Sequence, residues 1–284
     1  MVTLGLLIPP SIMMIVYGIS AQQSISRLFI AGIVPGLLIM GLFMGYVMIW
    51  SLLNRDAVPE AGPRLSFSEK LHRSRRLIPI ILLIATVIGS IYGGFATPTE
   101  AATLGALGLS WITGTLSWQS LIGSLMAATR TSCMITAIIL GAAFLSVGMA
   151  FLGIPTALAA WVAELGLSPA MLLVLLTLIY LVLGCFLEGA SMIALTTSVA
   201  LPMVVQAGFD PIWFGIYLII VVEMAQLPPP VGFNLFVLHS MSGRDMWTVT
   251  KASMPFFGLL ILGVVLLAAI PGMATFLPEL MLSR

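Results

Sequence analysis

The chain has 284 residues, of which 60% are hydrophobic and 7% are charged, and its formal net charge is +1. A mean hydropathy of +1.18 excludes an ordinary soluble globular domain and predicts an all-α polytopic membrane protein. The small net charge gives no reason to expect a nucleic-acid partner, and Cys133 and Cys185 lack the spacing of a metal site, disulfide framework or redox motif.

Residues 1–20 are apolar but are interrupted by Pro9 and Pro10. Proline has no amide hydrogen and clashes with the preceding turn, so carbonyls near Gly5 lose their helical partners. In hydrocarbon, an unpaired carbonyl is tolerated only where it is buried in protein or lines a wet cavity. The pattern therefore predicts a broken transmembrane helix, with Ser11 at the break.

The next stretch, Ile33 to Leu53, is long enough to span a bilayer, which takes roughly 20 residues. The loop 54–76 that follows holds six of the eleven basic residues. The positive-inside rule places this loop in the cytoplasm. We then expect outward and inward helices over residues 77–92 and 98–114, and the same alternation places the C-terminus outside.

The second of these helices begins with Thr97-Pro-Thr-Glu100. Threonine at the N-cap, Pro98 at the first helical position and glutamate at the third position are the residues of a capping box. A polar cluster in an apolar region could also serve transport. The capping argument accounts for every residue type, so we interpret the cluster as structural.

Residues Trp118–Arg130 are expected to lie along the cytoplasmic face, before a separate span over Ser132–Phe151. Residues 170–207 then contain two short apolar segments, joined by the polar sequence Leu187-Glu-Gly-Ala-Ser191. This pattern predicts a re-entrant hairpin that opens from the outside. Glu188 and Ser191 would lie at its tip near the membrane midplane and serve the transport pathway. Alternatively, the tip lies near the interface and Glu188 is only solvated.

A second break interrupts residues 212–240 at Pro228, Pro229 and Pro230. It should free the carbonyls of three preceding residues, and Gly232 and Asn234 would then begin the following half-helix. Freed carbonyls suit a cation and a helix N-terminus suits an anion. The three residues are Met224, Ala225 and Gln226. Glu223, one turn earlier, either adds charge to the same cavity or faces a neighbouring hydroxyl.

The two breaks correspond when the sequence is shifted by 220 positions, since Pro9, Pro10 and Pro35 then fall on Pro229, Pro230 and Pro255. In each copy the last proline is expected to open a long apolar helix. With the alternation above, the copies are inverted repeats, 1–53 and 77–284, separated by the loop 54–76. The first copy lacks a hairpin, so we expect further apolar segments upstream of Met1.

The blocks LGLLIPPSIMMIVYG, GGFATPTEAATLGA, GCFLEGASMIALTTSVALP and LPPPVGFNLFVLHSMSG, in this order, resemble the large membrane subunit of tripartite ATP-independent periplasmic (TRAP) transporters. The resemblance implies an ion-transporter-like fold of the elevator type in the bacterial inner membrane. It also implies sodium-coupled uptake of a carboxylate, such as a dicarboxylate or sialic acid. The partners would be a small membrane subunit and a periplasmic substrate-binding protein.

The predicted function is therefore that of a permease subunit that imports an organic anion, with sodium as coupling ion and no other cofactor. Sodium would bind backbone carbonyls near Gly5 and Gln226. One alternative is an ion-coupled anion transporter that needs no binding protein. Another is an intramembrane enzyme, but the chain has no HExxH motif, paired aspartates or Ser/His constellation. The candidate ion and substrate site comprises Gly5, Pro9, Pro10, Ser11, Glu188, Ser191, Gln226, Pro228, Pro229, Pro230, Gly232 and Asn234.

Overall fold

The computed structural model describes residues 7–55, 66, 69, 74–228 and 232–282, and all regular elements in this part are helices. Four of the described stretches are long and apolar enough to cross a membrane: Ile25–Leu53, Trp118–Phe151, Gly189–Gln206 and Met246–Ala269. Shorter apolar helices accompany them. The predicted all-α polytopic class agrees with this architecture, whereas most of the basic loop 54–76 lies outside the described residues.

The chain divides into two compact units. Unit 1 comprises Met1–Phe43 and Met134–Arg284, and unit 2 comprises Met44–Cys133. Helices α4 (Ile33–Leu53) and α8 (Trp118–Phe151) pass from one unit into the other. The three parts expected from the sequence, 1–53, 54–76 and 77–284, follow the charge pattern and not these units. They stay predictions about the repeat organisation.

Unit 2 contains a short 3-10 helix, η2 (Arg75–Leu77), followed by α6 (Ile78–Tyr92) and α7 (Pro98–Ile112). Helices α6 and α7 pack against each other. A Cβ at Gly105 of α7 would lie only 2.8 Å from Leu83 Cδ1 and Val87 Cγ2 of α6. The absence of a side chain at Gly105 therefore permits this close approach.

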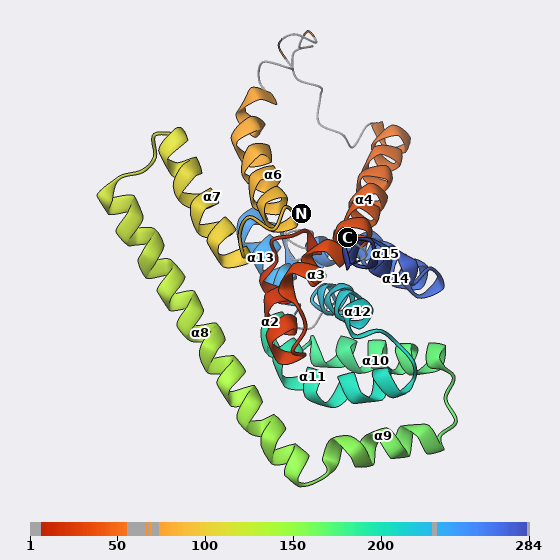
Figure 1. Cartoon of the computed structure of the whole chain (residues 1–284). Helices are drawn as coiled ribbons and strands as arrows, with labels where there is room; N and C mark the ends of the chain where they lie inside the picture. Colours follow the sequence, from red (N-terminus) through yellow and green to blue (C-terminus); the bar gives the residue numbers. More distant parts are fainter. Residues whose placement is uncertain (1–6, 56–65, 67–68, 70–73, 229–231, 283–284) are drawn as a thin grey trace. The chain divides into compact units, whose positions relative to one another are not determined.

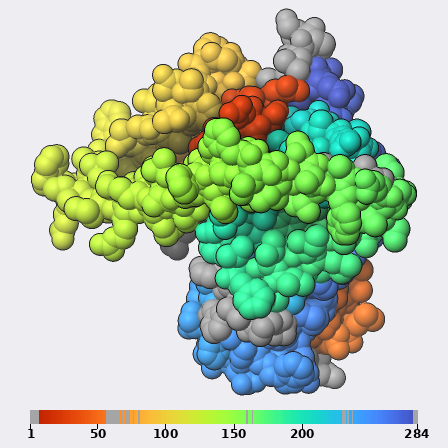
Figure 2. All heavy atoms as spheres, turned by 90° about the horizontal axis from the view of Figure 1, so that it is seen from below, coloured from red at the N-terminus to blue at the C-terminus, as the bar shows by residue number. Residues whose placement is uncertain are grey.

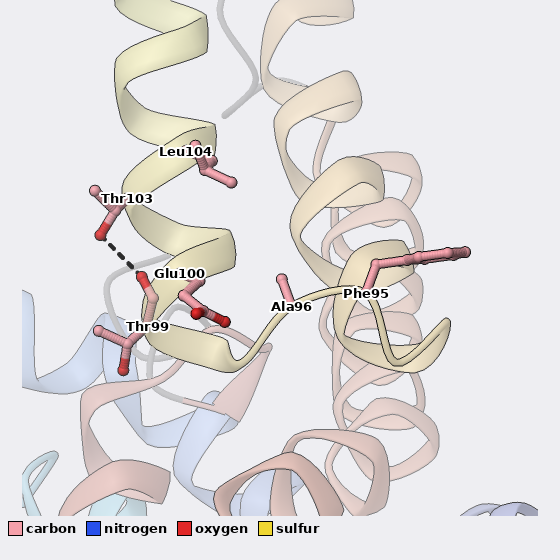
Figure 3. A pocket seen from close by; sticks show the side chains of 6 residues that line it. All are labelled: Phe95, Ala96, Thr99, Glu100, Thr103 and Leu104. Atoms are coloured by element: carbon pink, nitrogen blue, oxygen red, sulfur yellow. Dashed lines mark hydrogen bonds between the residues drawn. The ribbon is translucent and has the colours of Figure 1, made fainter.

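Helix α7 begins with the predicted capping box. Thr97 Oγ1 accepts a hydrogen bond from the Glu100 amide at 3.4 Å, and Glu100 Oε2 accepts one from the Thr97 amide at 2.8 Å. The same carboxylate oxygen accepts the Thr97 hydroxyl proton. A shallow pocket lies here, and Figure 3 shows Phe95 pointing away from the Glu100 side of it. These bonds confirm the cap at Thr97, Pro98 and Glu100.

Helix α8 is continuous over 34 residues. The predicted separation between Arg130 and Ser132 is therefore wrong. Polar residues near the expected break fit within the helix, because Thr129 Oγ1 donates to the Leu125 carbonyl at 2.8 Å. No Gly or Pro stands there to stop the helix. Most large apolar side chains of α8 are exposed, and Figure 2 shows the green, C-terminal part of α8 at the surface of unit 1.

Unit 1 holds the remaining helices, several of which begin at a side-chain cap provided by Ser11, Ser24, Ser168, Asp210 or Asp245. Such caps satisfy amides that have no partner within the helix. The helices are α2 (Ile12–Ser20), α3 (Ile25–Ala31), α9 (Ile154–Glu164), α10 (Pro169–Leu183), α11 (Gly189–Gln206), α12 (Pro211–Ala225), α13 (Phe233–Ser242), α14 (Met246–Ala269) and α15 (Gly272–Leu282).

Helix α12 forms the centre of unit 1. Every residue from Ile212 to Ala225 is buried, as expected for a helix that is apolar on all sides. It packs against α2, α3, α10, α11, α14 and α15, and Figure 1 shows it surrounded by these helices. The C-terminal end of α12 is therefore enclosed by protein.

Hydrogen bonds from buried aromatic side chains fix α12 within this shell. Tyr217 Oη donates to the Leu173 carbonyl of α10 at 2.7 Å, and Trp213 Nε1 donates to the Leu267 carbonyl of α14 at 3.3 Å. These donors need such partners, because an unpaired buried polar group is costly. The helix is thus held in register as well as buried.

The C-terminal helices differ from the prediction. Pro255 was expected to open a long helix near Met254, as Pro35 does near the start of α4, but it lies inside α14, which begins at Met246. The polar turn Asp245-Met-Trp begins α14 instead, since Asp245 accepts a hydrogen bond from the Trp247 amide at 3.0 Å. The correspondence between Pro35 and Pro255 therefore does not extend to their positions in helices.

A close contact between α10 and α12 yields a stability prediction. A Cβ at Gly184, just after α10, would lie 2.7 Å from the Ala225 carbonyl oxygen and 2.9 Å from its carbonyl carbon. Because these atoms belong to a buried backbone, Gly184→Ala should destabilise the protein by about 1–3 kcal/mol. Thermal unfolding in detergent will measure this loss.

Gly141→Ala is the matched control, because nothing lies within 4 Å of a Cβ at Gly141 of α8. Alanine favours a helix over glycine, so this variant should unfold at the wild-type temperature or slightly above it. Equal unfolding temperatures for Gly184→Ala and the wild type would contradict the close packing of α10 on α12.

Candidate functional site

Helix α12 ends at Ala225, before the proline-rich segment. Its final turn tightens: the Gln226 amide donates to the Glu223 carbonyl at 3.3 Å, and the Leu227 amide donates to the Met224 carbonyl at 3.2 Å. The Met224 carbonyl thus loses its α-helical partner at position 228, as expected, and a 3-10-type turn supplies another. Within the described residues, no backbone amide donates to the carbonyls of Ala225 or Gln226.

Two backbone carbonyls converge where α13 begins. A Cβ at Gly232 would lie 2.5 Å from the Gln226 carbonyl oxygen and 2.8 Å from that of Pro228. Only a residue without a side chain fits between these oxygens. Pro229 and Pro230 lie outside the described residues.

Three buried polar side chains flank the break. Glu223 is 2% exposed, and Gln226 and Asn234 are each 1% exposed. Both carboxylate oxygens of Glu223, Nε2 of Gln226 and Nδ2 of Asn234 have no hydrogen-bond partner among the described residues. Buried polar atoms are seldom left in this state, so the cluster has capacity for a ligand.

The N-terminus of α11 lies against this cluster. A Cβ at Gly189 would clash with Gln226 Nε2 and would lie 2.7 Å from Met13 Cε of α2 and 3.0 Å from Val222 Cγ1 of α12. Gly189 therefore lets α2, α11 and α12 meet at one point. This contact brings together the segment after the first proline pair, the polar sequence 187–191 and the end of α12.

Glu188 itself caps α11. Its Oε1 accepts the Ala190 amide at 3.0 Å, and its Oε2 accepts the amide and hydroxyl of Ser191 at 3.2 and 3.3 Å. Both side chains are half-buried. These bonds give Glu188 and Ser191 a structural role at a helix start, and any role in transport comes in addition to it.

Ser11 is 1% exposed and caps α2, accepting a hydrogen bond from the Met14 amide at 3.5 Å. Pro9 is buried and Pro10 is exposed. Gly5 lies outside the described residues, so the predicted carbonyl ligand near it stays a prediction.

Helices α2 and α12 run in opposite directions. Tyr17, towards the C-terminal end of α2, donates its hydroxyl proton to the Pro211 carbonyl at the start of α12 at 2.6 Å. Met13, near the N-terminal end of α2, reaches Gly189, which also faces Gln226 at the end of α12. The start of α2, which follows the first proline break, therefore lies near the end of α12, which precedes the second.

The structure thus brings Gln226, Gly232 and Asn234 near the N-terminus of α11, and the binding role expected for these residues stays a prediction. The sequence shows only that Glu223 lies one turn before the break. Its burial depends on how the helices pack and could not be predicted from the spacing. The chemistry of the cluster is that of oxygen donors: two converging carbonyls, a carboxylate and two side-chain amides. Such ligands suit a hard cation. The described residues contain no group of three or more His, Cys, Asp or Glu side chains of the kind that holds a transition metal.

Comparison with known proteins places this site in context. The family described as tripartite ATP-independent periplasmic transporter, DctM component, matches residues 2–273. The chain is 34% identical to the C4-dicarboxylate TRAP transporter large permease protein DctM of Pseudomonas aeruginosa over 98% of its own length and 65% of that protein.

Other relatives have different named substrates. The ectoine TRAP transporter large permease protein TeaC of Halomonas elongata is 31% identical, with 98% of this chain and 65% of that protein covered. The sialic acid TRAP transporter large permease protein SiaM of Vibrio cholerae is 29% identical, with 98% and 66% covered. The chain therefore spans about two thirds of the length of these relatives. These matches exclude the enzyme alternative, because they are to permeases.

With 272 consecutive residues matched by one family and identity to several large permease proteins over nearly its whole length, the chain belongs to the DctM component family of tripartite ATP-independent periplasmic transporters, a family of multi-pass membrane permeases.

Proposed function

We propose that this chain is the membrane permease component of a sodium-coupled, binding-protein-dependent secondary transporter that imports an organic anion. The observation that carries this proposal is the buried, unpartnered polar cluster at the end of α12. A helix that stops inside a protein and exposes carbonyls to a polar cavity is the arrangement that secondary transporters use for ions.

The anion would bind beside the cation. Helix α13 follows Gly232 without a side-chain cap, and although the Leu235 amide donates to the Gly232 carbonyl at 2.9 Å, the amides before it are available to a carboxylate. By contrast, the first turn of α11 is already occupied by the Glu188 carboxylate, and that of α2 by Ser11. Asn234, in the first turn of α13, adds a side-chain amide that can donate to a carboxylate or accept a cation.

The names of the relatives guide the choice of substrate. They specify a C4-dicarboxylate, sialic acid and ectoine, all of which carry a carboxylate group. A C4-dicarboxylate is the first substrate to test, since that relative has the highest identity of the three. The word tripartite in the family description supports two further components. We propose that these are a small membrane subunit and a periplasmic substrate-binding protein, in the inner membrane of a bacterium.

The antiparallel pairing of α2 and α12 supports inverted repeats, and the adjacent helices α10 and α11 support the re-entrant hairpin over 170–207. In an elevator mechanism the helices around the site move together relative to a scaffold. The hydrogen bonds of Tyr17, Trp213 and Tyr217 would keep such a moving group intact.

Uptake into sealed vesicles tests this function. The complete complex, reconstituted with its binding protein, should accumulate labelled succinate only when a sodium gradient and the binding protein are both present. Replacing sodium with potassium should abolish accumulation, because the larger ion does not fit a site arranged for the smaller one. Labelled sialic acid and ectoine test the other two substrate classes.

Each component of the proposal can fail separately in this experiment. Uptake that persists without the binding protein would favour the alternative of an independent anion transporter. Equal uptake in sodium and in potassium would contradict sodium coupling. A matched preparation without the permease chain gives the background.

The topology gives another prediction. In a variant without Cys133 and Cys185, cysteine introduced by Ser283→Cys should react with an impermeant maleimide in cells with a permeabilised outer membrane. Cysteine introduced by Ser68→Cys should react only after lysis, because the basic loop 54–76 is expected to be cytoplasmic. The opposite labelling pattern would overturn the orientation.

A further inference from the structure

Glu223 is the charged member of the buried polar cluster at the end of α12. It lies in the last full turn of α12, is 2% exposed, and neither of its carboxylate oxygens has a hydrogen-bond partner among the described residues. Two other acidic residues near helix ends, Glu188 and Asp210, accept hydrogen bonds from backbone amides. Glu223 therefore has no capping role that would explain its presence inside the protein.

An ionised carboxylate in this position is costly unless another charge or several donors compensate it. Two amide side chains are near enough to do part of this. Asn234 lies beside the carboxylate, and Gln226 stands one helical turn further along the same side of α12. By strict geometry each keeps an amide nitrogen without a hydrogen-bond partner among the described residues, although Asn234 is close enough to interact with the Glu223 carboxylate.

The backbone supplies oxygens at Gly232, two residues before Asn234. The carbonyl oxygens of Gln226 and Pro228 both lie where a Cβ of residue 232 would stand, so a side chain there would displace them. Carboxylate, amide and carbonyl oxygens together form a ligand set for a hard cation, and the carboxylate provides the net charge that carbonyl dipoles lack.

We propose that the Glu223 carboxylate provides the negative charge that holds the coupling cation at the break between α12 and α13, with Gln226 and Asn234 as positioning residues. This inference rests on the proposed sodium coupling and identifies the residue that makes the site charge-balanced. Without the cation, the buried carboxylate repels an anionic substrate at the nearby start of α13. With the cation bound, that repulsion is cancelled, so the cation favours binding of the anion.

Sodium-dependent unfolding of the purified complete complex tests the role of Glu223. A ligand that binds only the folded state raises the unfolding temperature as its concentration rises. Sodium chloride is varied against choline chloride at constant ionic strength for the wild type, Glu223→Gln and Glu223→Asp. Glu164→Gln, at the exposed end of α9, is the matched control for loss of a carboxylate.

The wild type and Glu164→Gln should show the same stabilisation by sodium. Glu223→Gln should require about tenfold more sodium or more, which corresponds to about 1.4 kcal/mol. Glutamine has the shape of a protonated glutamate, so a neutral Glu223 would make this variant respond like the wild type, and that result would overturn the proposal. Glu223→Asp keeps the charge on a shorter side chain and should show an intermediate sodium requirement.

If Glu223→Gln cannot be purified in folded form, Glu223→Asp decides the question. An unchanged sodium requirement in that variant would contradict a direct role for the carboxylate. The same measurement separates the role of Glu223 from sodium coupling itself. Sodium stabilisation that is equal in the wild type and both variants defeats only the role of Glu223, whereas a wild type that does not respond to sodium defeats the proposed sodium coupling itself.

Substrate binding provides a second measurement. Labelled succinate bound to the detergent-solubilised complex should depend steeply on sodium in the wild type. In Glu223→Gln the dependence should be weaker, because the repelling charge is gone along with the cation that it holds. An equally steep dependence in the variant would contradict the proposed link between this charge and the anion.

Discussion

The position of α12 constrains the rest of unit 1. It is apolar except at Glu223 and is covered by six other helices, so its C-terminal end is buried, whereas Asp210 at its N-terminal end is exposed. Proline at 228 prevents the chain from continuing the helix, yet the break occurs where backbone carbonyls remain enclosed. The buried end of this helix is polar, because the side chains at 223, 226 and 234 lie near the break and are almost fully buried.

Glycines make this convergence sterically possible. Gly184 admits the carbonyl of Ala225, Gly189 admits the side chain of Gln226, and Gly232 leaves room for two carbonyl oxygens. Each glycine thus brings backbone or polar atoms closer than a side chain would permit. The same residues link stability to function, because widening any of these contacts would shift the ends of the helices that define the site.

Local sequence patterns predicted local features well. The capping box at Thr97, a helix start after Pro10 and a helix stop before Pro228 depend on neighbouring residues alone, and the structure contains all three. Features set by longer-range context were missed. Polar residues at 129–132 did not end α8, and Pro255 did not begin a helix, since hydroxyl groups bond within a helix and Asp245 caps α14 upstream.

The same distinction separates Glu188 from Glu223. Sequence spacing drew attention to Glu188, because it lies in a polar segment, but its oxygens are used by the first turn of α11. Glu223 lies in an apolar run, and only the packing of other helices reveals that it is buried without a partner among the described residues. Stability alone would replace such a carboxylate with an apolar side chain. Its presence at the end of the central helix is therefore best explained by a ligand that compensates its charge.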